Sequence, residues 1–120
     1  MMSLLSAKDN SLNGKVRHIK SVLATVSTTD VYHYERPQGL ERFIVWQESG
    51  EATPMMSNNR KSNQQIEGSI DLYTNIEYDV YIDQIQEALD ESSRIAWELS
   101  SVQYEDDTGL IHYEWTFTVI

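Results

Sequence analysis

The 120-residue sequence contains no cysteine, two prolines and five single glycines. Without cysteine there are no disulfide bonds and no thiolate metal sites, which fits a reducing compartment. No apolar run approaches the about 18 residues of a membrane-spanning helix. Residues 1–8 lack the basic and then apolar layout of a signal peptide. We therefore expect a protein that is made and used inside a cell.

Basic residues are also scarce, with nine Lys and Arg against nineteen Asp and Glu, and the formal net charge is -10. Residues 67–120 carry thirteen acids and one base, a balance of -12, whereas residues 1–66 carry six acids and eight bases, a balance of +2. Phosphate contacts need Lys and Arg, so this distribution argues against binding to duplex nucleic acid. The acidic half suits either a solvated face or a contact with the basic half of another copy.

The length and the 40% apolar content suit one domain over residues 1–120. Apolar spacing predicts two helices, with Ser11 and Asp79 as their N-caps, and short β-rich runs between turn residues predict the strands. In chain order, the expected elements are a helix at Ser11–Val26, strands at Val31–Arg36, Arg42–Glu48 and Gln65–Tyr73, a helix at Asp79–Ser93, and strands at Trp97–Tyr104 and Leu110–Ile120. Residues 1–10 are expected to extend the first helix or to form a loose arm. Residues 49–64 are expected to form a long polar loop.

The hairpin over Trp97–Ile120 is the clearest element. Its last strand alternates apolar and polar residues from Ile111 to Val119, which is typical of a half-buried strand. Gly109 provides a residue that tolerates a positive φ in the turn. The order α-β-β-β-α-β-β, with short connections, predicts an α+β fold. We expect a mostly antiparallel five-stranded sheet with two helices packed on one face.

Patterns that could support catalysis or metal binding are incomplete. Asp107–Gly109 spells the aspartic-protease tripeptide, but that chemistry needs two such aspartates sharing a proton, and Asp and Gly are common in turns. His33–Glu35 and His112–Glu114 repeat a His-Tyr-Glu triplet whose ends share a strand face. This arrangement fits solvent-facing cross-strand pairs better than a metal site. The sequence therefore predicts no enzyme activity, cofactor or metal.

Several stretches carry a resemblance to a known family: Tyr32–Tyr34 with Arg36-Pro37, Phe43–Glu48, Ser57–Lys61, Gln65–Thr74, Val102–Glu105 and Thr108–Trp115. Together they resemble tail-completion, tail-terminator or head-tail joining proteins of siphophages and prophages of Gram-positive bacteria. The resemblance implies a ring, often a hexamer, that ends tail-tube growth and seats the head connector. It also implies assembly in the bacterial cytoplasm, a final place in the virion, and no catalytic residues.

Two charged groups are the candidate assembly contacts. Arg60 and Lys61, in the expected loop, could reach an acidic neighbour. Glu105, Asp106 and Asp107, in the hairpin turn, could form an acidic rim. The expected partners are other copies of the chain, tail-tube proteins and head-connector proteins, with no nucleic acid and no membrane. The alternatives are a small acidic inhibitor or nucleic-acid mimic that binds a host protein, and an enzyme of the same gene cluster.

Overall fold

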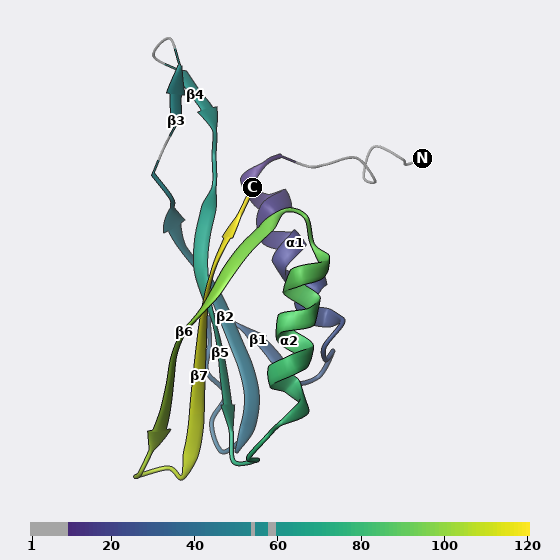
Figure 1. Ribbon diagram of the computed structural model, residues 1–120, viewed down its shortest axis with the longest axis vertical. Coiled ribbons are helices and arrows are strands. Elements are labelled where there is room, and N and C mark those ends of the chain that lie inside the picture. Colours follow the sequence, from purple (N-terminus) through teal and green to yellow (C-terminus); the bar gives the residue numbers. More distant parts are fainter. Residues whose placement is uncertain (1–9, 54, 58–59) are drawn as a thin grey trace.

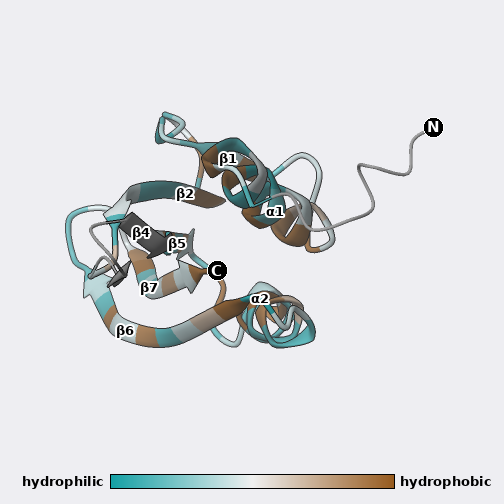
Figure 2. Ribbon diagram, turned by 90° about the horizontal axis from the view of Figure 1, so that it is seen from above, coloured by the Kyte–Doolittle hydropathy of each residue, from teal (hydrophilic) through white to brown (hydrophobic). Residues whose placement is uncertain are grey.

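The computed structural model describes residues 10–53, 55–57 and 60–120, and for residues 55–57 and 60–63 it describes the backbone path only. Its elements are α1 (Leu12–Ala24), β1 (Val31–His33), β2 (Arg42–Glu51), β3 (Met55–Ser57), β4 (Arg60–Asn63), β5 (Ile66–Thr74), α2 (Val80–Glu91), β6 (Ile95–Glu105) and β7 (Leu110–Val119). The five-stranded sheet has the order β1-β2-β5-β7-β6. Both helices lie on the same side of this curved sheet (Figures 1 and 2).

The predicted α+β class, element order and helix placement are confirmed, but the sheet is mixed. The pairs β2–β5, β5–β7 and β7–β6 are antiparallel, whereas β1 runs parallel to β2. Parallel neighbours usually need a crossover of about a dozen residues, so the short connection favoured an antiparallel pair. Here β1 is only three residues long. The connection over residues 34–41 reverses direction through positive φ angles of 71° at Tyr34 and 77° at Gly39.

The two helices begin at the residues that the sequence predicts as caps. The Ser11 hydroxyl accepts a hydrogen bond from the Gly14 amide at 2.9 Å, and the Asp79 carboxylate accepts one from the Tyr81 amide at 2.9 Å. Such side chains satisfy amides that have no partner in the first helical turn. The helices end a few residues earlier than predicted, at Ala24 and Glu91.

The core lies between the helices and the face of the sheet that they cover. Residues at alternate positions point into it from β5 (Ile66, Ile70 and Leu72) and from the second half of β7 (Trp115, Phe117 and Val119), as period-two patterning requires. The buried apolar residues of this cluster are Ile19, Leu23, Ile44, Trp46, Ile66, Ile70, Leu72, Ile85, Leu89, Ile95, Trp115, Phe117 and Val119. The helical stripes and the alternating strand therefore meet as the sequence predicts.

The predicted loop over residues 49–64 is wrong in its centre. Strand β2 continues past a register shift between Glu48 and Gly50 and still pairs with β5 at Glu51. Strands β3 and β4 then pair with each other in a separate two-stranded sheet, which extends beyond the main sheet (Figure 1). The segment is polar and lacks the apolar alternation that marks a strand, so the pattern favoured a loop.

Gly68 provides a test of the packing between β5 and its neighbours. A Cβ atom there would overlap the Gln47 carbonyl oxygen and lie 2.6 Å from Phe117 Cζ, whereas a Cβ at Gly50 would meet nothing within 4 Å. We expect Gly68→Ala to lower the free energy of unfolding by about 3 kcal/mol through overpacking. Gly50→Ala, in the neighbouring strand, should change it by less than about 0.5 kcal/mol. Urea unfolding followed by tryptophan fluorescence measures both; equal values would contradict the close packing at Gly68.

Candidate functional site: assembly surfaces and a polar network

The two predicted groups of assembly residues lie at opposite ends of the molecule. The chain measures 52 Å along its longest axis, with the β3–β4 hairpin at one end and the β6–β7 turn at the other (Figure 1). Arg60 and Lys61 belong to β4, and their side chains lie outside the described part of the structure. Asp106 and Asp107 lie in the turn and are exposed. One chain therefore does not bring its basic and acidic groups together.

Glu105 differs from its two acidic neighbours because it helps to build the turn. Its carbonyl oxygen accepts a hydrogen bond from the Gly109 amide at 2.8 Å, and its carboxylate accepts one from the Thr108 hydroxyl at 3.1 Å. Gly109 has the positive φ, 73°, that its place in the turn predicts. An Arg36 nitrogen also lies 3.9 Å from the Glu105 carboxylate, an exposed pair that contributes little to stability. Asp106 and Asp107 are thus better placed than Glu105 to meet another molecule.

A groove of about 640 Å³ lies between the 36–41 connection and the start of β7. Phe43 and Leu110 contribute its apolar wall. Arg36 borders it and holds its guanidinium carbon 4.1 Å from the centre of the Tyr73 ring. Sequence reasoning did not find this groove, because its walls come from a loop and a strand that are distant in the chain. The Arg36-Pro37 dipeptide was its only local signal.

Two histidines form cross-strand pairs, as expected, but with carboxylates other than those of their triplets. His33 Nε2 lies 2.8 Å from Glu48 Oε1, and His112 Nε2 lies 2.7 Å from Asp71 Oδ1. The Tyr34 hydroxyl also donates to Glu48. Burial alone would raise the pKa of Glu48, but the hydrogen bonds from Tyr34 and His33 outweigh it and lower that pKa. Within residues 10–53, 55–57 and 60–120, no three His, Asp or Glu side chains gather as a metal would require.

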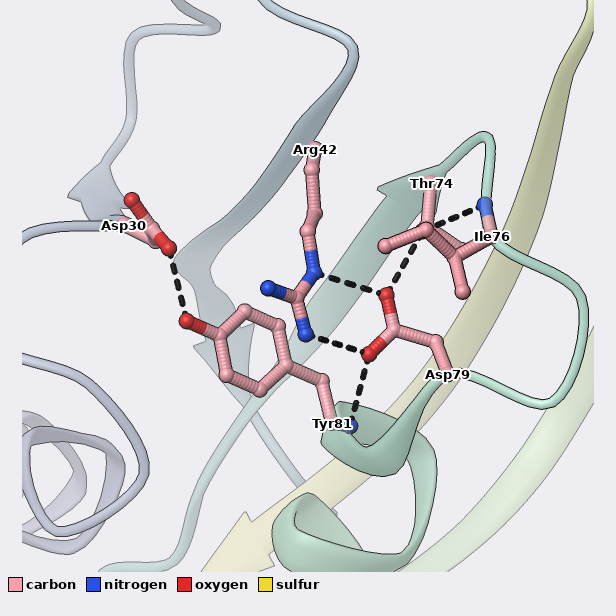
Figure 3. A network of polar contacts seen from close by, with 6 residues as sticks. All are labelled: Asp30, Arg42, Thr74, Ile76, Asp79 and Tyr81. Atoms are coloured by element: carbon pink, nitrogen blue, oxygen red, sulfur yellow. Dashed lines mark hydrogen bonds and ion pairs between the residues drawn. The ribbon is translucent and has the colours of Figure 1, made fainter.

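A polar network joins the start of α2 to the sheet (Figure 3). Asp79 is 3% exposed, and its carboxylate accepts two hydrogen bonds from Arg42, at 2.8 Å from Nε and 2.7 Å from the terminal nitrogen. The Thr74 hydroxyl donates to the same carboxylate at 2.6 Å. Together with the Tyr81 amide, these donors satisfy both oxygens of the buried carboxylate. Burial by itself would raise the pKa of Asp79, but the donors, Arg42 foremost, outweigh it and lower that pKa.

The network continues from α2 to β1 through Tyr81. The Arg42 guanidinium carbon lies 3.8 Å from the centre of the Tyr81 ring, in cation–π geometry. The Tyr81 hydroxyl donates to the Asp30 carboxylate at 2.6 Å (Figure 3). The Asp30 carbonyl in turn accepts from the Ile44 amide at 2.8 Å. These contacts join α2 to β2, to β5 and to the segment before β1.

The outer edge of β6 is a surface that sequence reasoning missed. Strand β6 is an edge strand of the five-stranded sheet and spans eleven residues. Three large apolar side chains along it are exposed: Leu99 by 42%, Val102 by 52% and Tyr104 by 64%. A long, apolar strand edge readily pairs with another chain, and natural proteins usually protect such edges. The local signal was the apolar content of residues 95–104, which fits the predicted hairpin equally well.

No helix in the described part of the chain is long and apolar enough to cross a membrane.

Comparisons with known proteins identify the fold. No protein-family model matches the sequence, and no curated protein matches it. Among solved structures, the chain is similar to one described as "Virion of native gene transfer agent (GTA) particle". The two share 13% sequence identity and superpose with a TM-score of 0.55 over 94% of this chain and 96% of the other. At this identity the likeness shows a shared fold over nearly the whole of both chains.

The Asp79 network generates a stability prediction with a matched control. Asp79→Asn keeps a capping side chain but removes the negative charge from Arg42, so we expect a loss of about 2 kcal/mol in the free energy of unfolding. Asp83→Asn removes an exposed charge from the same helical turn and should cost about 0.5 kcal/mol or less. Urea unfolding at pH 7 measures both. Equal losses would show that the helix dipole, and not the pair with Arg42, accounts for the effect.

The same network generates a pH dependence. The folded-state pKa of Asp79 is lowered from its ordinary value of 3.8, so its contribution is fully present above that value. The contribution is lost as the pH falls below 3.8 through the lower, folded-state pKa. The stability difference between the wild type and Asp79→Asn should therefore be constant from pH 7 to about pH 5 and shrink on further acidification. Urea unfolding at a series of pH values checks this, and a difference that grows on acidification would contradict it.

Proposed function

We propose that this chain is a structural, non-enzymatic protein of a phage-like particle. We propose further that it forms a ring at the head-tail junction and completes or terminates the tail. The observation that carries the proposal is the shared fold with a chain of a gene transfer agent virion over nearly the full length of both. The resemblance of the strand sequences to tail-completion proteins supports the finer role. This proposal places the protein in the virion after assembly in the bacterial cytoplasm.

The distribution of polar groups supports a role in assembly rather than in catalysis. Asp79, Glu48 and Asp71, which the structure places in polar clusters, each pair with a cation, a histidine or a hydroxyl. Such pairs fix neighbouring strands and helices to one another. Other features are of another kind: an exposed apolar strand edge, an exposed acidic turn and a hairpin whose sequence is basic. These are features that other protein surfaces can recognise through shape and charge.

The elongated shape suits a subunit that meets different partners at its two ends. The β6–β7 turn carries Glu105, Asp106 and Asp107, and the opposite end carries Arg60 and Lys61 (Figure 1). If the long axis lies along the tail, one end faces the tail tube and the other faces the head connector. A ring of such subunits would cap the last tube subunits by covering their free surface, and it would present a new surface to the connector.

The acidic carboxy-terminal half favours a second candidate, a mimic that occupies a basic groove of a host protein. Residues 67–120 carry a net charge of -12, which suits competition with nucleic acid. This role needs one host partner and no ring. Affinity capture with the tagged chain from infected cells separates the two candidates: a single nucleic-acid enzyme as partner favours the mimic, and tail proteins favour the structural role.

A deletion in the phage or prophage that encodes the chain tests the proposal. We expect particles whose tails vary in length or remain unattached to heads, because nothing ends tube growth or seats the connector. Electron microscopy of the particles measures tail length and attachment, and the deletion complemented in trans is the control. Normal virions from the deletion strain would refute the proposed function.

A further inference from the structure

Two features of the fold lack a structural partner within the described part of the chain. The β3–β4 hairpin continues outward from the paired ends of β2 and β5, and its two strands pair only with each other. A two-stranded ribbon without a third strand is at best marginally stable in water. The main sheet has two edge strands, and the eleven-residue β6 offers a much longer edge without a strand beside it than the three-residue β1. The β3–β4 hairpin therefore has no third strand, and the main sheet has an unpaired edge at β6. Addition of an extended segment to a sheet edge is a common mode of protein recognition.

The hairpin and the edge also carry opposite charges. Residues 52–65, which include the hairpin, contain Arg60 and Lys61 and no acid, a balance of +2. Residues 95–109, which include β6 and its turn, contain four acids and no base, a balance of -4. Charge complementarity of this kind selects a partner and fixes its orientation. It disfavours two β6 edges pairing with each other, because that contact would place like charges together.

The hairpin cannot reach the turn of its own chain, because the two lie at opposite ends of the 52 Å axis (Figure 1). We propose that the β3–β4 hairpin of one copy docks on the β6 edge of a second copy. Each copy then donates its hairpin on one side and offers its edge on the other. This heterologous contact repeats from copy to copy and closes into a ring when the rotation between copies permits. The inference deepens the proposed function, on which it rests, by naming the contact that would form the ring.

Crosslinking in the full-length chain tests the contact directly, and the absence of cysteine provides a clean background. One tagged chain carries Ser57→Cys or Ser62→Cys, one in each half of the hairpin region. A differently tagged chain carries Gln103→Cys, an exposed position on β6. The two are mixed over a range of concentrations with a bismaleimide and analysed for dimers that carry both tags. Glu87→Cys, exposed on α2, replaces Gln103→Cys in the control mixture.

We expect the mixed dimer from the hairpin and β6 cysteines and none above background from the α2 control. Val102→Lys should abolish this product, because lysine on an edge strand blocks pairing. Val80→Lys, at another exposed apolar residue, should leave it unchanged. Reversing the hairpin charge with Arg60→Glu and Lys61→Glu should also abolish the product. Adding Asp106→Lys and Asp107→Lys to the partner chain should restore it.

Three results would overturn the inference: a mixed product no stronger than the α2 control at every concentration, a product only between two Gln103→Cys chains, or a product insensitive to both Val102→Lys and charge reversal. The second result would indicate a two-fold dimer through β6. The crosslinking tests only the contact between copies, whereas the deletion phage tests the proposed function, so the two failures can be told apart. A deletion phage with uncontrolled tails, combined with no crosslink, would retain the tail role and place the contact between copies elsewhere.

Discussion

The buried pair between Arg42 and Asp79 is the interaction on which the arrangement of the helices over the sheet depends. It fixes the first turn of α2 to the start of β2, and through Thr74 it also holds the end of β5. Tyr81 extends the attachment to the segment before β1. Removal of either partner would leave the other charge without compensation, so the pair ties α2 and β2 together in one relative position. The apolar stripe of α2 reaches the core in the correct register as a result.

The two helices cover one face of the sheet, and the β6 edge is left without a neighbouring strand in the described part of the chain. This uncovered edge connects the structure with the proposed role. Ile85 and Leu89 of α2 are buried in the core against the sheet, whereas Leu99, Val102 and Tyr104 of β6 remain exposed. A monomer gains little from a long apolar edge, because it invites pairing. A subunit of a closed ring uses the same edge as a contact surface. The separation of opposite charges along the axis suits the contact proposed between copies.

Much of the fold could be predicted from local pattern, whereas the sites could be predicted only in part. The alternation from Ile111 to Val119 and the caps at Ser11 and Asp79 are short-range signals, and they are confirmed. The parallel pairing of β1 and the β3–β4 hairpin were missed, because a three-residue strand and a polar strand leave no periodic signature. Arg42 and Asp79 are 37 positions apart, so nothing local links them. The acidic turn was found because its residues are adjacent in the chain.

The sequence by itself determined the α+β class, the order of the elements, the faces that enter the core and the uneven charge of the two halves. Each of these follows from residue spacing or composition, which act over a few positions of the chain. Only the tertiary structure decided that the acidic turn and the basic hairpin lie at opposite ends, that β6 forms an edge, and that Arg42 meets Asp79. These features depend on strand order and on contacts between distant residues. The carboxy-terminal hairpin, the clearest element in the sequence, therefore supplies both buried core residues (Trp115, Phe117 and Val119) and the exposed edge proposed for assembly.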